Sequence, residues 1–405
     1  MKRDGKVLIS GGLGFIGKRV ASTLVELGHD VVLFDNLSPP VHGAVPHLCE
    51  DAIVRHPRVG VVRGDVRSAA DWARILPGVR YVVHLAAETG TAQSMYEIAR
   101  YAQTNFSGLC EFLNYLADSP QQIERVILAS SRAVYGEGAY NCNDCGRVYP
   151  LPRCYETLDA GQWNPTCPRC AAPCWVPVPT AEAARLSPSS IYGATKRTQE
   201  DLLRISSAAL GLPAVILRLQ NVYGEGQSLK NPYTGMLTIF AGQLRNGYRL
   251  NLFEDGQESR DFVHVDDVAR AVTLALFREG VDGFTLNVGS GVATSLENVA
   301  QKLCTHFGDG ADYAITGQFR MGDVRHAIAD LTLVGQKLDY RPHISLDEGL
   351  DRLVQWVRAH PETPAEWASA NEELVRRGLM PSIPVHAHRT SLAVRREGKQ
   401  RVSGS

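Results

Sequence analysis

The stretch KVLISGGLGFIG, residues 6–17, joins a short apolar run to a glycine-rich turn. The run KVLIS ends at glycine, which is typical of a buried parallel strand. Gly11, Gly14 and Gly17 follow with the spacing G-x-x-G-x-x-G, and helical periodicity continues over residues 20–27. Glycine lets the backbone N–H groups of such a turn approach a pyrophosphate, and the helix N-terminus adds partial positive charge. The stretch predicts a dinucleotide-binding turn, with a glycine-rich turn that holds no ligand as the alternative.

A carboxylate follows the second apolar run, at residues 31–34. Asp35 lies 18 residues after Gly17, where it can accept hydrogen bonds from ribose hydroxyls and would repel a 2′-phosphate. This position favours NAD over NADP. Asp65 and Val66, after a third run, are placed to approach the adenine, and an ordinary turn role for Asp65 is the alternative.

Apolar runs alternate with helical stretches along much of the chain. Further strands are expected at residues 61–63, 81–84, 126–129 and 214–219. This alternation predicts an α/β fold with a doubly wound parallel sheet, the Rossmann arrangement, and helices on both faces. We divide the chain into a dinucleotide-binding domain (1–140 and 177–225), an insert (141–176), a smaller substrate-binding lobe (226–360) and a C-terminal segment (361–405), whose polar, basic end is predicted to be disordered.

The composition argues against several classes of protein. The 405 residues carry a formal net charge of −1, so nothing indicates a nucleic-acid partner or an acidic membrane surface. No apolar run reaches the roughly 18 residues of a membrane span. Glycines interrupt the apolar start of the chain, which argues against a signal peptide. We therefore expect a cytoplasmic protein with no nucleic-acid and no membrane partner.

Six of the nine cysteines lie within residues 142–174. Four of them form two C-x-x-C pairs separated by 21 residues, Cys142 with Cys145 and Cys167 with Cys170. In a reducing compartment this paired spacing predicts tetrahedral, structural Zn²⁺ held by four thiolates, as in a zinc ribbon. Cys154 and Cys174 are spare candidates, and free or partly disulfide-bonded cysteines are the alternative.

Tyr192 and Lys196 form a Y-x-x-x-K motif within a predicted helix at residues 190–203, so one helix face carries both side chains. A nearby ammonium group lowers the pKa of a phenol, which makes a base suited to taking a proton from a hydroxyl. A hydroxyl of the segment SSRAVYG, from Ser130 or Ser131, follows the strand expected at residues 126–129, where it can reach the same oxygen. Tyr192, Lys196 and this serine are predicted to be catalytic, and an unrelated surface pair at 192 and 196 is the alternative.

Seven stretches occur in the order found in one enzyme family. They are GGLGFIG, HLAAETGTAQS, SSRAVYG, SIYGATK, LRLQNVYGEG, ESRDFVHVDDVA and RMGDVRHAIAD. The sequence resembles the extended short-chain dehydrogenase/reductase family, in its NAD-dependent epimerase/dehydratase group, which acts on nucleotide sugars. The resemblance implies that Tyr192 is the catalytic base, that Lys196 holds the nicotinamide ribose, and that Ser131 shares the proton of the sugar hydroxyl.

The resemblance also implies cofactor and substrate contacts. The remaining cofactor residues are Phe15, Ile16, Asn36, Leu85, Ala86 and Ala87. The substrate residues are Asn221, Arg260, Arg320 and Asp323, and the two arginines suit a clamp on the diphosphate. Asn105 matches a helix asparagine near the family's active site, with a structural hydrogen bond as the alternative.

The two positions directly after the catalytic hydroxyl residue differ between the enzymes of the family that catalyse different reactions. Family dehydratases carry an Asp-Glu pair there, and this chain has Arg132 and Ala133. Neither side chain is a general acid or base at neutral pH, which argues against dehydration. The glutamate usual in family decarboxylases is absent as well. The simplest remaining mechanism is transient oxidation at sugar carbon 4, with return of hydride to the other face of the sugar. We therefore predict an NAD-dependent 4-epimerase. An NAD-linked dehydrogenase or reductase is one alternative, and a non-catalytic NAD-binding protein, which would not need the catalytic three, is another.

The insert separates Ser131 from Tyr192 by 61 positions, more than in most members of the family. Together with the stretches QSMYEI, GEGAY and NPYTG, this arrangement resembles a bacterial subgroup, the dTDP-L-rhamnose 4-epimerases. The expected substrate is therefore dTDP-L-rhamnose or a related NDP-hexose. We expect the insert to cover or shape the sugar pocket, and the family resemblance implies a homodimer.

Overall fold

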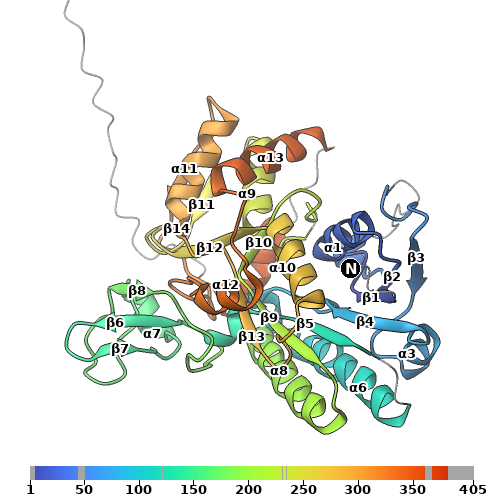
Figure 1. Cartoon of the computed structure of the whole chain (residues 1–405). Helices are drawn as coiled ribbons and strands as arrows, with labels where there is room; N and C mark the ends of the chain where they lie inside the picture. Colours follow the sequence, from blue (N-terminus) through green and yellow to red (C-terminus); the bar gives the residue numbers. More distant parts are fainter. Residues whose placement is uncertain are drawn as a thin grey trace, which may run out of the picture.

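The apolar runs of the sequence pair into one sheet of seven strands (Figure 1). The structure is a computed structural model, and it describes residues 5–43, 51–119, 123–229, 231–233, 235–360 and 367–381. From edge to edge the strands are β13 (Thr285–Val288), β9 (Ala214–Leu219), β5 (Arg125–Ser131), β4 (Val79–His84), β1 (Lys6–Ser10), β2 (Val31–Asp35) and β3 (Val59–Arg63). Each strand runs parallel to its neighbours. The prediction of an α/β fold with a doubly wound, Rossmann-like sheet is confirmed.

Helices cover both faces of this sheet because successive strand residues point to opposite sides. Val7 and Ile9 of β1 pack in one buried cluster, and Leu8 between them packs in the other. The first cluster includes residues of α1 (Phe15–Glu26), α10 (Val265–Phe277) and α12 (Thr332–Leu338), and the second includes residues of α3 (Ala69–Ile75), α6 (Gly108–Asp118) and α8 (Ile191–Leu210). Each face of the sheet therefore has its own apolar core.

One strand of the sheet comes from the range expected to form the substrate-binding lobe, residues 226–360. Strand β13 pairs with β9, with Thr285 opposite Ile216, and both α10 and α12 pack on the same sheet. The chain leaves the sheet after β9 and later returns to its edge. The boundary expected at residue 225 therefore does not separate the sheet from the lobe, because a four-residue edge strand carries no local signal of the sheet to which it will add.

The smaller lobe has a separate apolar core. Its elements are a sheet of β10 (Asn221–Tyr223), β12 (Ser259–His264) and β14 (Ala293–Ser295), a pair of β11 (Leu250–Leu252) with β15 (Tyr313–Ile315), and the helices α9 (Met236–Arg245), α11 (Leu296–Phe307) and α13 (Leu346–Ala359). The loops between these elements face the carboxyl ends of the large sheet, as the cavity described below shows.

The insert forms a small unit of its own that projects from the body of the molecule (Figure 1). It contains an antiparallel sheet of β6 (Ala139–Cys142), β7 (Gly146–Val148) and β8 (Val176–Val178), and the short helix α7 (Tyr155–Asp159). Its buried cluster consists of Tyr140, Val148 and three cysteines. A unit of this size has almost no core without its cysteines.

Several short elements complete the described chain. They are α2 (Pro39–His42), α4 (Thr91–Ser94), α5 (Ile98–Tyr101), a π-helical turn at Ala102–Ser107, a 3-10 turn at Arg132–Tyr135, and α14 (Trp367–Arg376). Helix α14 belongs to the C-terminal segment, whose polar end, predicted to be disordered, lies outside the described residues. Among the helices that the structure describes, none combines the length and the apolar character needed to cross a bilayer.

Candidate active site

A cavity of about 580 Å³ lies between the large sheet and the smaller lobe, beyond the carboxyl ends of the strands, where doubly wound sheets bind ligands. Many residues predicted to contact cofactor or substrate line it, namely Gly11, Gly14, Phe15, Ile16, Gly17, Asp35, Asn36, Val66, Leu85, Ala86, Ala87, Ser131, Tyr192, Asn221, Arg260, Arg320 and Asp323. Asp65 and Lys196 lie outside the lining. The structure thus gathers almost the whole predicted set, while the roles of these residues stay predictions.

The glycine-rich turn has the shape that a bound pyrophosphate needs. Gly11 adopts a φ of +68°, and a Cβ there would lie 2.8 Å from the backbone nitrogen of Ala86. A Cβ on Gly17 would lie 2.5 Å from the carbonyl oxygen of Gly11. Helix α1 has no side-chain cap at its start, so its first N–H groups remain available to an anion at the cavity wall. These donors fit the diphosphate of NAD.

The two acidic residues expected near the adenosine differ in their surroundings. Asp35 is buried at the end of β2, where its carboxylate accepts hydrogen bonds from the backbone N–H groups of Leu13 at 3.1 Å and Leu37 at 2.9 Å. The Asp65 carboxylate accepts from the backbone and the guanidinium of Arg67, which lowers the pKa of Asp65. The contacts of Asp65 match the alternative of a turn residue, and its neighbour Val66 lines the cavity.

Tyr192 and Lys196 occupy the first two turns of α8. Ser190 caps this helix by accepting a hydrogen bond from the backbone N–H of Gly193 at 3.1 Å. The Tyr192 phenol lies near enough to the Ser131 hydroxyl, at the end of β5, for that hydroxyl to favour the ionised phenol. The Lys196 ammonium donates to the carbonyl oxygen of Ala129 at 2.8 Å. The cap and the strand end together bring Tyr192 and Ser131, which are 61 positions apart in the sequence, to one side of the cavity.

The pKa of Tyr192 depends on its burial and on two neighbouring side chains. Burial raises the pKa of Tyr192, while the hydrogen bond from Ser131 and the positive charge of Arg132 act in the opposite direction. Burial lowers the pKa of Lys196 to about 7, against the opposing charge of Glu200. In this structure Arg132 is the cation acting on the phenol, and Lys196 is directed at the β5 backbone. That Lys196 lowers the pKa of Tyr192 stays a prediction.

Arg132 is a site residue whose role the sequence analysis missed. Its Nε donates to the Oδ1 of Asn221 at 3.0 Å, and it lines the cavity beside Ser131 and Tyr192. Burial and the like charge of Arg260 lower the pKa of Arg132 to about 10, so it stays protonated at neutral pH. The sequence feature that could have pointed to Arg132 is that it is the one charged residue in the segment SSRAVYG.

The two arginines predicted to clamp a diphosphate, Arg260 and Arg320, are fixed in place by neighbouring residues. The Nη1 of Arg260 donates to the carbonyl oxygens of Ser259 at 2.9 Å and Arg325 at 3.1 Å. Arg320 donates from Nη2 to the Oδ1 of Asn371 in α14 at 2.7 Å, and its guanidinium lies over the Phe253 ring. These supports fix both cations at the cavity. No local pattern pointed to Asn371.

Several buried polar atoms at the cavity have no hydrogen-bond partner among the described residues. They are Oε1 of Gln220, the Tyr223 hydroxyl oxygen, Oε2 of Glu258 and Nε of Arg320. All four residues line the cavity. Because unsatisfied buried polar groups are costly, they indicate that the cavity is built for a polar ligand.

Asn105 lies away from the cavity lining. Its side chain accepts from the backbone N–H of Glu88 at 2.8 Å and donates to the Thr195 hydroxyl at 3.0 Å. These contacts tie the π-helical turn to α8 and to the loop after β4. The structural alternative therefore fits Asn105 better than a direct role.

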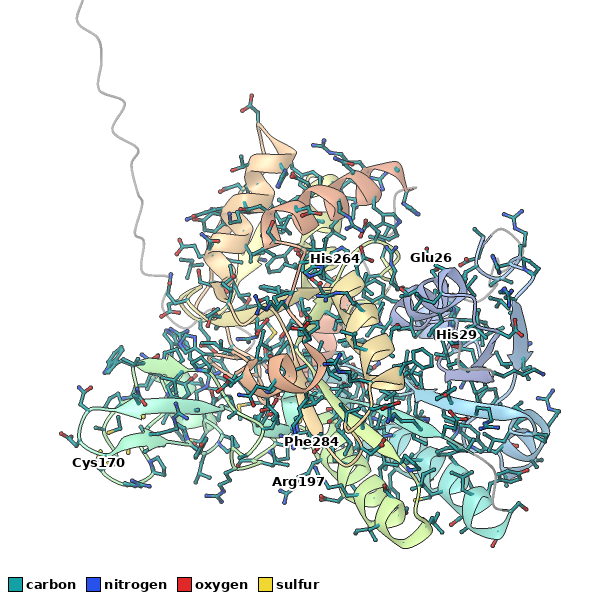
Figure 2. All side chains as sticks on the ribbon, in the orientation of Figure 1. Glu26, His29, Cys170, Arg197, His264 and Phe284 are labelled. Carbon is teal, nitrogen blue, oxygen red and sulfur yellow. The ribbon has the colours of Figure 1, made fainter. Side chains whose placement is uncertain are left out.

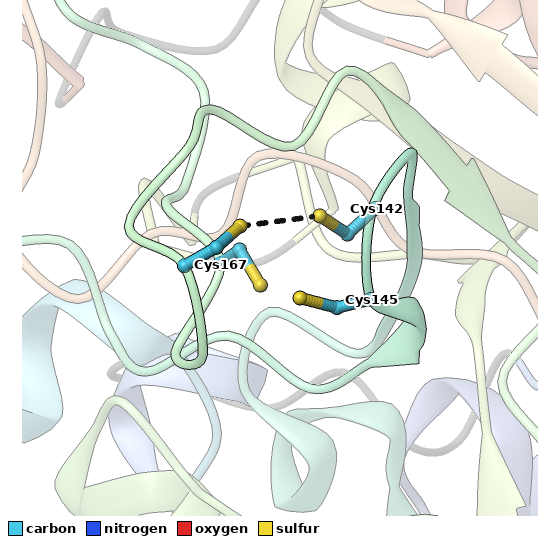
Figure 3. A group of neighbouring side chains, drawn as sticks. Cys142, Cys145 and Cys167 are labelled. Atoms are coloured by element: carbon cyan, nitrogen blue, oxygen red, sulfur yellow. Dashed lines mark hydrogen bonds between the residues drawn. The ribbon is translucent and has the colours of Figure 1, made fainter.

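The four paired cysteines of the insert converge (Figure 3). The sulfur atoms of Cys142, Cys145, Cys167 and Cys170 all lie within 4.8 Å of one another, and those of Cys142 and Cys170 are 3.5 Å apart. Tetrahedral Zn²⁺ with bonds of about 2.3 Å would hold its sulfurs about 3.8 Å apart, so the set fits this metal. Cys154 and Cys174 lie outside the group.

The insert does not line the cavity, so the expectation that it covers the sugar pocket is not met, while the expectation that it shapes the pocket stays a prediction. None of the described residues of 141–176 belongs to the cavity lining. Cys170 lies at the outer part of the projecting insert, far from the body of the molecule (Figure 2). Any influence of the insert on substrate must therefore pass through other residues.

Sequence comparison places this geometry in a family. The sequence model of the "NAD dependent epimerase/dehydratase family" matches residues 7–152 and 170–289, well over half of the chain. The chain belongs to this family. Between its two matched parts the family model leaves out residues 153–169, which begin after the first C-x-x-C pair and extend into the second. This part of the insert is therefore an addition to what the family shares.

Individual members of the epimerase/dehydratase family resemble the chain along most of its length. The dTDP-L-rhamnose 4-epimerase of Burkholderia thailandensis is 39% identical over 358 residues, which cover 87% of this chain and 95% of the relative. The crystal structure of UDP-glucose 4-epimerase from Thermotoga maritima with UDP-glucose is 28% identical, with a TM-score of 0.69, covering 87% of this chain and 98% of that one. MoeE5 in complex with UDP-glucose and NAD is 26% identical, with a TM-score of 0.67, covering 87% and 99%.

Proposed function

We propose that this chain is an NAD-dependent nucleotide-sugar 4-epimerase that acts on dTDP-L-rhamnose or a related NDP-hexose. The observation that carries the proposal is that Tyr192 and Ser131 come together at the wall of a cavity that also contains the glycine-rich turn. The likeness to the Burkholderia dTDP-L-rhamnose 4-epimerase supports the choice of sugar nucleotide.

The residues divide the reaction as follows. Tyr192, as phenolate, takes the proton from the hydroxyl on sugar carbon 4, with the Ser131 hydroxyl hydrogen-bonded to the same oxygen. Arg132 favours the phenolate by its positive charge. NAD, when bound, accepts hydride from carbon 4 and returns it to the opposite face of the 4-keto sugar. Tyr192 then gives the proton back, and carbon 4 is inverted.

The residue at position 132, an arginine, argues against dehydration as the reaction of this site. A dehydratase needs groups that move protons at neighbouring sugar carbons. Arg132 stays protonated, and Ala133 has no titratable group. The site therefore contains the groups for oxidation and reduction at one carbon, which an epimerase or an NAD-linked dehydrogenase shares.

A panel of dTDP-, UDP- and GDP-sugars distinguishes these two activities. We expect the purified chain to convert dTDP-L-rhamnose, or a related NDP-hexose, to its C4 epimer, as resolved by NMR. An epimerase regenerates its cofactor, so the absorbance of reduced NAD should show no net change during turnover. Stoichiometric formation of reduced NAD with an oxidised sugar product would instead support a dehydrogenase.

The four-cysteine group leads to a separate proposal, a structural Zn²⁺ in the insert. All four predicted ligands are thiolates and leave no open position, so the metal would stabilise the insert and take no part in the chemistry. We expect about one zinc per chain in the purified protein. The variant Cys142→Ala should lose most of this zinc and melt at a lower temperature, measured by elemental analysis and calorimetry.

The matched control is Cys154→Ala, because Cys154 is exposed and outside the four-cysteine group. It should keep the zinc content and the Tm of the unmodified chain. Equal zinc content in the Cys142 and Cys154 variants, or disulfides among the four cysteines, would reject the metal site.

A further inference from the structure

A buried ring of ion pairs and hydrogen bonds joins the insert to the smaller lobe. Arg153 of the insert donates from Nε to the Oε1 of Glu137 at 2.9 Å and from Nη1 to the Oε1 of Glu254 at 2.8 Å. Arg325 of the lobe completes the ring, since its backbone N–H donates to Glu137 at 2.8 Å and its Nη1 to Glu254 at 2.9 Å. The side chains of all four residues are at most 4% exposed.

The same arginine of the insert also contacts the loop that contributes to the cavity. We call residues 319–325 the substrate loop, because Arg320 and Asp323 within it line the cavity. The Nη2 of Arg153 donates to the carbonyl oxygen of Asp323 at 3.0 Å. One guanidinium therefore connects the insert with the backbone of a residue predicted to contact substrate.

Further residues of the insert hold both ends of the substrate loop. At its start, the buried ring of Phe319 packs against Tyr155 and Trp163, with ring centroids 5.3 and 6.3 Å away. At its end, the Nε of Arg325 donates to the Oδ1 of Asn164 at 3.3 Å. The loop contains turns but no helix or strand, so these contacts take the place of secondary structure in fixing its shape.

We propose that Arg153 is a positioning residue for the nucleotide sugar: it holds the substrate loop in the binding conformation from a place outside the cavity. The inference rests on the proposed function, because it takes the ligand of this loop to be the nucleotide diphosphate of the substrate. Ordering a mobile loop on binding costs conformational entropy, and a loop that is already ordered avoids that cost. The insert thereby acts on substrate affinity without touching the substrate.

Lysine cannot replace the guanidinium in this arrangement. Arg153 donates to four acceptors, the fourth being the carbonyl oxygen of Trp163 at 2.9 Å. An ammonium group keeps the positive charge between Glu137 and Glu254, but its shape cannot reach all four acceptors. Arg153→Lys therefore removes positioning contacts while leaving the buried carboxylates compensated. Arg153→Met instead leaves Glu137 without a cation and Glu254 with Arg325 alone.

The experiment compares Arg153→Lys and Arg153→Met with the control Arg147→Met in the full-length protein. Arg147 is an exposed arginine of β7 in the same insert. For Arg153→Lys we expect the Kd for dTDP, measured by calorimetry, and the KM for the sugar nucleotide to rise about tenfold. The kcat should stay within about twofold and the Kd for NAD should be unchanged, as for the loss of uniform binding. Arg147→Met should match the unmodified chain in every measurement.

The measurements distinguish a failure of the inference about Arg153 from a failure of the proposed function. If no sugar of the panel is turned over, the proposed function fails, and the dTDP affinities still compare the variants. The inference is overturned if folded Arg153→Lys binds dTDP like the unmodified chain, or if Arg147→Met weakens dTDP binding equally. A joint fall in kcat and NAD affinity in Arg153→Lys would also overturn it. If Arg153→Met does not fold, Arg153→Lys alone carries the test.

Discussion

Replacing Tyr192 by phenylalanine is expected to lower kcat by a factor of roughly 10² to 10⁴, the usual contribution of a general acid–base group. The ring remains, so packing on the cavity wall is kept. The hydroxyl near Ser131 is lost, and that hydroxyl is the group proposed to accept the proton from the sugar oxygen. Turnover measured by NMR and NAD affinity measured by calorimetry are the two readouts, and NAD affinity should change by about twofold or less.

A neighbouring tyrosine provides the matched control. Tyr101 is fully buried, its ring lies 6.5 Å from that of Tyr192, and its hydroxyl donates to the carbonyl oxygen of Thr89. Tyr101→Phe removes the hydrogen bonding of this hydroxyl to Thr89 and Gln93 but no group of the catalytic set, so we expect less than about a tenfold loss of activity. Equal losses in the two variants would mean that the Tyr192 hydroxyl has no chemical role.

Lys196→Met is expected to lower activity by about 10²-fold or more and, at the same time, to raise the Tm by a few degrees at pH 6. Burial lowers the pKa of Lys196 from 10.5 to about 7, so the folded state is penalised for the buried charge at low pH. Methionine has a similar shape and no charge. The stability gained by removing the buried charge should exceed the stability lost with the hydrogen bond to the Ala129 carbonyl oxygen.

The pH dependence of this stability difference has a definite sign. The unfolded chain holds the lysine proton up to about pH 10.5, and the folded chain releases it near pH 7. The penalty is therefore complete below pH 7 and disappears as the pH rises towards 10.5. The Tm advantage of Lys196→Met should shrink across that interval, as measured by calorimetry in a series of buffers.

The control for the lysine variant is Lys302→Met. Lys302 is one-third exposed in its ion pair with Asp347, so its removal should change the Tm little. A Lys196→Met chain that is less stable than the unmodified protein at pH 6, while Lys302→Met is unchanged, would contradict the expected penalty for the buried ammonium.

The sequence by itself determined the parts of this protein that depend on spacing within one short segment. The strand–turn–helix unit at residues 6–17, the shared helix face of Tyr192 and Lys196, and the convergence of two C-x-x-C pairs all follow from local backbone geometry. The chain needs no distant contact to define these features. They predicted the fold class, and the motifs of the family resemblance added part of the cavity lining.

Only the tertiary structure decided the partners of the long, charged side chains. Lys196 is directed at the β5 backbone, and Arg132 is held by Asn221, 89 positions away in the sequence. Arg153 reaches Asp323 across 170 positions, which gives the insert its contact with the substrate loop. A flexible charged side chain pairs with whichever acceptors folding brings near, and the spacing of residues along the chain does not encode that neighbourhood.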